Sequence, residues 1–235
     1  FNNDSFLTQA SGNVVVVCKE TSFYAEMGGQ VGDQGVLVHN GETFKVINTF
    51  KLPNGQHAHI VSLDNHTLHV GDYVTLKVDE EFRNNVCSNH SATHLLNESL
   101  RKVLGSHVVQ QGSLVTDERL RFDFNHYNNL SNDEIIEIES LVNEQINKAI
   151  PVITLELSKE DAIKSGAQAA FGEKYGDIVR VVDMEFSKEL CGGTHVKNTK
   201  EIVRFALVSI ESKGSGIFRI EALTGDNVLN AMSEH

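Results

Sequence analysis

The 235-residue sequence has only three cysteines, no run of about 18 apolar residues, and fewer cationic than acidic side chains (20 against 32). An odd cysteine count without disulfide-like spacing is typical of proteins kept in a reducing compartment, so we expect a cytoplasmic location. Because neither a long apolar run nor a basic-then-apolar N-terminus is present, we expect no membrane span and no signal peptide. The sequence thus predicts a chain without a membrane partner.

The formal net charge of -12 at pH 7 argues against non-specific nucleic-acid binding through the whole surface, because such binding depends on neutralising phosphates. A local basic groove remains compatible with this charge. The length fits one large domain or two modest ones. Since the first residue is Phe1 and not Met, we expect a piece of a longer polypeptide.

Two short motifs concentrate metal-binding side chains: HSATH at 90–94 and CGGTH at 191–195. Residues at i and i+4 share one face of a helix, so His90 and His94 can present two imidazoles to one ion. The two glycines after Cys191 permit a tight turn that would bring Cys191 and His195 together. Two or three nitrogens and one thiolate form a ligand set that suits tetrahedral zinc.

Each motif alone is weak, because paired histidines on a helix often only cap, hydrogen-bond or face solvent. A zinc protease of the HExxH kind is disfavoured, since Ser91 stands where the general-base Glu would follow the first His. If all four ligands bind at once, the ion has no vacant tetrahedral position and has a structural role; if one ligand is loose, water or substrate can enter. The sequence leaves open whether zinc activates water or positions the substrate.

The sequence of residues 1–80 predicts a small β-barrel-like module, because short apolar segments are separated by the turn-forming residues Gly, Asn and Asp. Strands are expected at 14–17, 35–38, 44–47, 57–61 and 73–78. His57 and His59 alternate on one of these strands, and we expect them on the sheet surface.

From about residue 80 the pattern becomes α+β. Apolar spacing predicts a helix over 84–104 that carries the HSATH motif and ends at Gly105. A second helix is expected between a capping box at Ser131 and Pro151, with strands before and after it. We expect three parts: a β-rich module at 1–80, a zinc-containing domain at 81–223 with helices on a mostly antiparallel sheet, and the start of a truncated helix at 224–235.

Seven motifs, in one order, resemble the editing region of alanyl-tRNA synthetase. They are TSFYAEMGGQVGD at 21–33, HSATHLL at 90–96, QQGS at 110–113, RFDF at 121–124, FGEKY at 171–175, CGGTH at 191–195 and RIEA at 219–222. The resemblance runs from about residue 14 to the C-terminus, and the region is related to free-standing alanyl-tRNA editing proteins and to the editing domain of threonyl-tRNA synthetase.

The resemblance implies hydrolysis of tRNA(Ala) mischarged with Ser or Gly, with the tRNA acceptor end as partner. Such a step is needed because a pocket sized for alanine rejects glycine and serine only weakly. ATP and alanine would then bind only a missing upstream domain, and the full-length protein would be able to form a homodimer. Alternatives are a free-standing trans-editing protein, a zinc-stabilised tRNA-binding module without catalysis, and a metal-dependent hydrolase of small molecules.

The resemblance also implies site residues. His90, His94, Cys191 and His195 match the zinc ligands. Gln110 and Thr93 match positions that handle the aminoacyl group, although Thr93 can instead bond to its own helix backbone and Gln110 can be a strand-surface residue. With the zinc ligand Cys191 they are the expected catalytic residues. The loop at 28–30 is expected both to form a tight turn and to lie near the nucleic acid, with Arg119, Arg121 and Lys174 as weaker candidates for RNA contacts.

Overall fold

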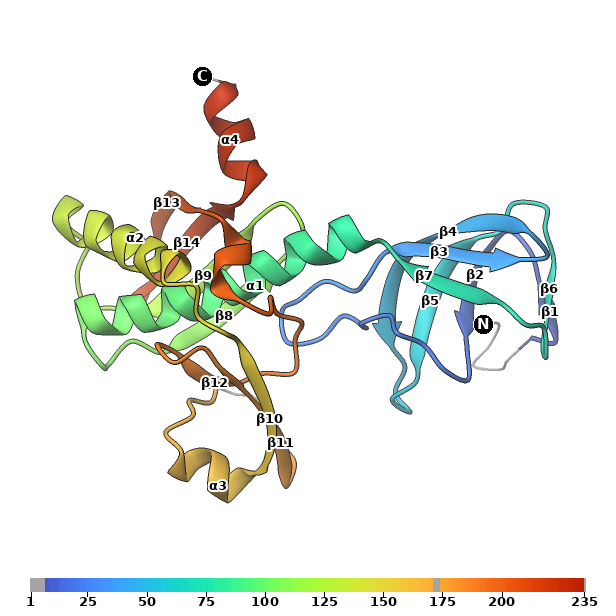
Figure 1. Cartoon of the computed structure of the whole chain (residues 1–235), viewed down its shortest axis with the longest axis horizontal. Coiled ribbons are helices and arrows are strands. Elements are labelled where there is room, and N and C mark those ends of the chain that lie inside the picture. Colours follow the sequence, from blue (N-terminus) through green and yellow to red (C-terminus); the bar gives the residue numbers. More distant parts are fainter. Residues whose placement is uncertain (1–6, 171–173, 235) are drawn as a thin grey trace. The chain divides into compact units, whose positions relative to one another are not determined.

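The computed structural model describes residues 7–170 and 174–234, so the first three residues of the motif at 171–175 lie outside the described part. The chain divides into two compact units (Figure 1). The first comprises 1–27 and 31–83, and the second comprises 28–30 and 84–235. The tripeptide at 28–30 thus belongs to the second unit, although its neighbours on both sides belong to the first.

The first unit is built from strands. They are β1 (Gln9–Ala10), β2 (Asn13–Val17), β3 (Gly35–His39), β4 (Glu42–Lys51), β5 (His57–Ser62), β6 (Leu68–His69) and β7 (Thr75–Val78). Five of them form an antiparallel sheet in the order β2-β5-β4-β3-β7, and β1 pairs with β6. The five expected strands all form, whereas the two-residue strands β1 and β6 are too short to leave a pattern in the sequence.

The core of this unit gathers around Phe23, with Leu37, Val46, Val61 and Leu63 among its buried members. The expectation that the histidines of β5 lie on the sheet surface is wrong for His59, which is fully buried. Its imidazole bonds to the hydroxyl of Thr21 at 2.8 Å and to the carbonyl of Val16 at 2.8 Å. These two bonds satisfy both ring nitrogens, so the histidine is a structural residue of the core.

The second unit combines helices and strands. They are α1 (Glu80–Leu104), which begins within the first unit, β8 (Gln110–Val115), β9 (Leu120–Asn125), α2 (Asn132–Asn147), β10 (Ile153–Ser158), α3 (Lys159–Lys164), β11 (Ile178–Asp183), β12 (Lys188–Leu190), the 3-10 helix η1 (Thr199–Ile202), β13 (Phe205–Gly214), β14 (Ile217–Thr224) and α4 (Asp226–Ser233). Two antiparallel sheets form, in the orders β13-β14-β9-β8 and β10-β11-β12. The expected α+β class with antiparallel sheets is confirmed.

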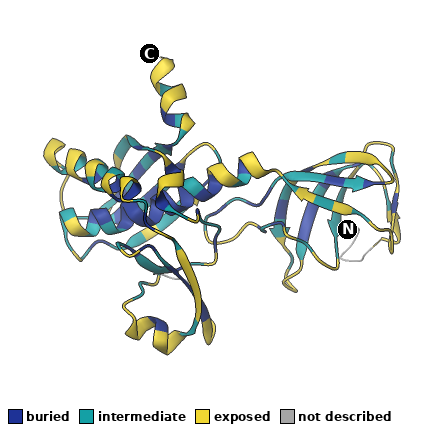
Figure 2. Ribbon diagram, in the orientation of Figure 1, coloured by how far each residue is buried: buried dark blue, intermediate teal, exposed yellow. Residues whose placement is uncertain are grey.

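One core joins α1 and α2 to the four-stranded sheet. Its members include Leu96 of α1, Val142 of α2, Phe122 of β9 and Ile220 of β14, all fully buried. Figure 2 shows that the middle of α1 is buried. In its first turn Glu80 and Glu81 are exposed, whereas Phe82 is buried. No helix among the described residues is long and apolar enough to cross a membrane.

The helix ends follow local side-chain bonds. The helix predicted over 84–104 is confirmed, but it starts at Glu80 because the Asp79 carboxylate accepts the amide of Phe82 at 3.0 Å. Ser131 and Glu134 form the expected capping box at the start of α2. That helix ends at Asn147, one turn before Pro151, because Ala149 adopts a positive φ of 52°.

Candidate metal centre and adjoining cavities

The middle of α1 is buried on every side, yet it is rich in polar residues. Every residue from Asn89 to Asn97 is buried, including both histidines of the HSATH motif. A helix surrounded by protein usually carries apolar side chains, because each buried polar group needs a partner to offset its lost hydration. The buried polar segment of α1 therefore indicates a functional site rather than ordinary core packing.

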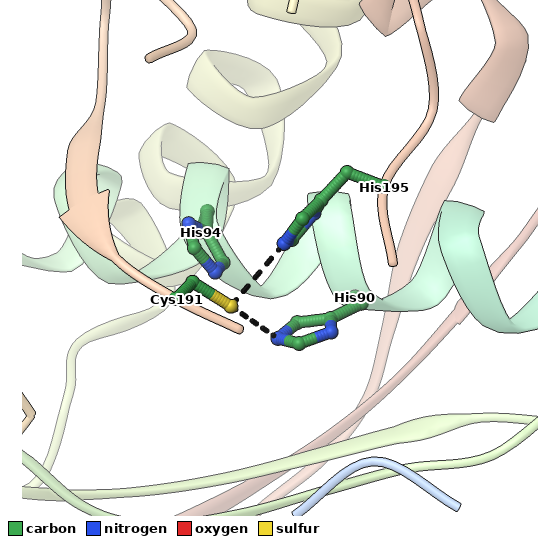
Figure 3. Close-up of side chains that lie close together, drawn as sticks. All are labelled: His90, His94, Cys191 and His195. Carbon is green, nitrogen blue, oxygen red and sulfur yellow. Dashed lines mark hydrogen bonds between the residues drawn. The ribbon is translucent and has the colours of Figure 1, made fainter. Parts of the chain in front are cut away.

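The structure brings together the four side chains expected as metal ligands. Figure 3 shows His90 and His94 projecting from α1 toward Cys191 and His195, which belong to the loop after β12. One potential ligand atom from each residue lies within 4.8 Å of those of the other three. The Cys191 sulfur is 3.4 Å from Nε2 of His90 and 3.3 Å from Nε2 of His195.

All three imidazoles are held in the neutral form that a metal ion requires. Burial, and then the nearby Arg180, lower the pKa of His94 to about 3. Burial is also the main reason why the pKa values of His90 and His195 are lowered well below the usual value, with their histidine neighbours adding to it. A neutral imidazole keeps one lone pair for coordination.

The donor set fits zinc. Three imidazole nitrogens and one thiolate match a four-coordinate site, and zinc bond lengths of about 2.0–2.3 Å place tetrahedral ligand atoms about 3.5 Å apart. The two sulfur-to-nitrogen distances, 3.4 and 3.3 Å, agree with that spacing.

Each histidine has a polar side chain facing its Nδ1 atom. Gln30 Oε1 lies 2.7 Å from Nδ1 of His90, and Ser91 Oγ lies 3.0 Å from Nδ1 of His195. Glu189 Oε2 lies 3.5 Å from Nδ1 of His94. Metal-binding histidines commonly donate the second ring N–H to such partners, which leaves Nε2 for the metal.

Hydrogen bonds that involve its backbone hold the Cys191 loop in place. The guanidinium of Arg180 donates to the carbonyl oxygens of Cys191 and Gly193, and the Gly193 amide donates to the Cys191 sulfur at 3.3 Å. The amide–sulfur bond favours the thiolate form of the cysteine, which is the form that binds metals. A Cβ atom at Gly193 would overlap the ring of His90, so the glycine lets the loop approach α1.

A cavity of about 250 Å³ adjoins this cluster. Its lining includes Glu189, Asn97, Gln110, Gln168 and Arg101. Asn97 donates to Glu189 Oε1 at 2.7 Å, while burial raises the pKa of Glu189 to about 7. Glu189 therefore lines the cavity with a carboxyl group that also contacts a candidate ligand.

Gln110 and Thr93 differ in their surroundings. Gln110 lines this cavity and also a second one of about 150 Å³, whose wall includes Gly28, Gly29 and Gly112. Its amide makes a long bond of 3.4 Å to Ser113 Oγ. Thr93 is buried, and its hydroxyl donates to the carbonyl of Asn89 at 2.8 Å, which is the helix-backbone bond anticipated as the alternative to substrate binding.

Three residues around the cluster were not singled out from the sequence as its partners. They are Gln30, Arg180 and Glu189. In the sequence Gln30 belongs to a glycine-rich loop, and its separation of 60 residues from His90 gives no local signal of contact. For Glu189 the only available signal is its place two residues before Cys191.

Arg119 is one of the residues that the sequence suggests for RNA contacts. Its Nη1 atom lies 3.6 Å from Oε2 of Glu221.

Comparisons with known proteins cover both units. The family described as threonyl and alanyl tRNA synthetase second additional domain matches residues 179–221, and class II tRNA synthetases (A) match residues 2–82. Alanine--tRNA ligase 1 of Lachnoclostridium phytofermentans is 52% identical over 214 residues, which are 91% of this chain and 24% of the relative. Alanine--tRNA ligase of Pseudothermotoga lettingae is 51% identical over 226 residues, which are 96% of this chain and 26% of the relative. The chain spans about a quarter of the length of these curated relatives.

Proposed function

The chain belongs to the alanine–tRNA ligase family, and from this premise we propose that it carries the editing activity of such an enzyme. The reaction is hydrolysis of tRNA(Ala) mischarged with Ser or Gly. Water attacks the carbonyl carbon of the aminoacyl ester, the bond from that carbon to the ribose oxygen breaks, and a free amino acid and tRNA leave.

The observation that carries the proposal is the cavity of about 250 Å³ that shares Glu189 with the surroundings of the metal cluster. It is large enough for a small aminoacyl group, and Gln110 on its wall has an amide able to bond to an amine or a carbonyl. Clefts that combine a few polar groups with titratable residues of shifted pKa are frequent reaction sites.

His90, His94, Cys191 and His195 would hold a zinc ion, which when bound would supply positive charge near the ester carbonyl of the substrate. We favour this positioning role over activation of water, because four protein ligands fill a tetrahedral site and leave no position for a bound water. Gln110 would hold the aminoacyl group, and the buried Asn97 together with Glu189, whose side chain is 12% exposed, would limit access of bulk water.

The proposal assigns editing to residues 81–223. ATP and alanine would bind the part of the relatives that this chain does not span. The partner is the acceptor end of tRNA(Ala), and the chain works where cysteines stay reduced, as in the cytoplasm.

The experiment is deacylation of Ser-tRNA(Ala) by the purified chain and by its Cys191→Ala variant, with the metal content of each measured. We expect the variant to lose bound zinc and at least about tenfold in hydrolysis rate, because one ligand of four is missing. Cys18→Ala is the matched control, since Cys18 is a free cysteine of the first unit. It should hydrolyse the ester as fast as the parent chain.

Equal hydrolysis by the parent and the Cys191→Ala variant would refute the proposed site. If the parent chain binds the tRNA while the ester survives at its spontaneous rate, the chain is an RNA-binding module. If a free seryl ester is cleaved as readily as Ser-tRNA(Ala), the chain is a hydrolase of small molecules. Either of these two outcomes would contradict the editing proposal.

A further inference from the structure

The tripeptide Gly28–Gln30 is fixed to strand β8 of the second unit. The carbonyl of Gly29 accepts the amide of Val115 at 2.8 Å, and Gln30 forms a parallel bridge with the same residue. A Cβ atom on Gly29 would overlap the carbonyl oxygen of Ser113, so only glycine allows this approach. The backbone of the tripeptide therefore has a defined position from which the side chain of Gln30 extends.

That side chain is 1% exposed and reaches both metal-binding motifs. Its Oε1 atom lies 2.9 Å from the amide nitrogen of Thr194 and 2.7 Å from Nδ1 of His90. Its Nε2 atom donates to Thr194 Oγ1 at 2.7 Å. One amide thus connects helix α1 to the Cys191 loop, although the three residues are far apart in the sequence.

These contacts determine which nitrogen of His90 carries the proton. The backbone N–H of Thr194 can only donate, so the Gln30 atom that faces it must be the carbonyl oxygen. The same oxygen faces Nδ1 of His90, which must therefore donate its own proton to it. In a neutral imidazole Nε2 then has a free lone pair, and this is the atom that faces the Cys191 sulfur.

We propose that Gln30 is a positioning residue of the metal centre, which fixes His90 in its Nδ1–H tautomer and holds the Cys191 loop against helix α1. The inference rests on the metal site of the proposed function and adds a residue to it. Gln30 does not touch the metal or the substrate in this role. It acts through the orientation of His90 and through the amide of Thr194.

The first test measures the affinity of the purified chain for Zn²⁺ by competition with a chromogenic chelator. Gln30→Ala should bind the ion roughly 10- to 100-fold more weakly, which is the usual effect of removing a partner of a metal-bound histidine. Gln30→Glu keeps an oxygen that accepts both N–H groups, so it should recover most of the affinity.

Asn143→Ala is the matched control, because Asn143 is a half-buried residue whose side-chain amide also connects two elements. From helix α2 its side chain bonds to the backbone N–H and C=O of Phe205 on strand β13, both at 2.9 Å. This variant should lose stability without losing zinc affinity. If Gln30→Ala binds zinc as tightly as Asn143→Ala and the parent chain, the positioning role is refuted.

The second test needs no variant. In the metal-free parent chain, nitrogen-15 NMR of labelled histidines should show His90 with its proton on Nδ1. A proton on Nε2 would refute the proposal even if Gln30→Ala did not fold. A parent chain that binds no zinc would refute the metal site itself, whereas tight zinc binding by both the parent and Gln30→Ala would refute only the role of Gln30.

Discussion

Gly193 lies directly against the imidazole of His90, so close that a Cβ atom at position 193 would overlap Cε1 and Nδ1 of that ring. The same atom would approach Oε1 of Gln30 to 2.7 Å. The glycine is therefore required by contact between the two metal-binding motifs. Its backbone is not among those with positive φ, so conformational freedom is not the reason for it.

Gly193→Ala should displace His90 while the rest of the fold is retained. Because the ring is a candidate ligand, we expect the affinity for Zn²⁺ to fall by at least about tenfold. Chelator competition measures this, and circular dichroism reports the fold. Gly176→Ala is the control, since a Cβ atom there would only contact the carbonyl of Ile178 at 3.9 Å. Equal zinc affinity of the two variants would contradict the prediction.

The metal-free chain should become more stable as the pH rises from about 5 to 6.5. In the unfolded chain histidines take up protons below a pH of about 6.5, whereas burial keeps His90, His94 and His195 neutral in the folded chain. Their contribution to stability is therefore present above pH 6.5 and lost as the pH falls. Glu189 opposes this, because its raised pKa of about 7 makes the folded chain hold a proton that the unfolded chain releases near pH 4.5.

Three histidines outweigh one carboxyl group in this window, so these four groups contribute a net difference of at most two protons and a slope of at most about 2.7 kcal/mol per pH unit. Urea unfolding of chelator-treated protein measures the slope. Glu189→Gln removes the opposing group and should steepen the dependence by about 1.4 kcal/mol per pH unit at most. A flat dependence in the parent chain, or a shallower one in the variant, would contradict this account.

The sequence predicts the elements that carry the ligands, because those signals are local. The i and i+4 spacing of His90 and His94 requires only a helix, and the apolar stripe of 84–104 supplies one. The capping box of Ser131 and Glu134 involves residues three positions apart. The motif at 191–195 contains its own glycines, so a turn is expected without knowledge of the rest of the fold.

The partners of the ligands could not be predicted in the same way. Gln30 reaches Thr194 across 164 residues, and Glu189 faces His94 of helix α1 from strand β12. Such contacts depend on how distant segments pack, and no periodicity within one segment reports them. Burial of His59 was missed for the same reason, because the Thr21 hydroxyl that bonds to it belongs to another part of the first unit.

Asp33→Ala should destabilise the first unit by about 3 kcal/mol, because it leaves a partly buried cation without its partner. The side chain of Asp33 is 2% exposed and accepts bonds from Arg83, whose side chain is 30% exposed, and from the Tyr24 amide at 2.7 Å. The exposure of the arginine places the expected loss at the low end for broken buried pairs. Urea unfolding measures it.

The control for this loss is an ion pair at the surface. Oε1 of Glu144, on helix α2, lies 2.9 Å from Nζ of Lys148, the residue that follows this helix, and the two side chains are 56% and 53% exposed. Glu144→Ala should cost less than about 0.5 kcal/mol, because water screens such pairs. Comparable losses in the two variants would show that burial of Asp33 does not strengthen its pair.

Gln110→Ala should slow deacylation of Ser-tRNA(Ala) roughly 10- to 100-fold while zinc content and stability stay unchanged, since one hydrogen bond to the substrate would be lost. Gln110 lines both cavities, and its long 3.4 Å bond to Ser113 contributes little to the fold.

Gln111 is the matched control. It lines only the smaller of the two cavities, is exposed, and bonds to the carbonyl of Val109 at 3.3 Å. Gln111→Ala should keep most of the activity. If the two variants lose activity equally, the larger cavity beside Glu189 is not where the aminoacyl group binds, because only Gln110 borders it.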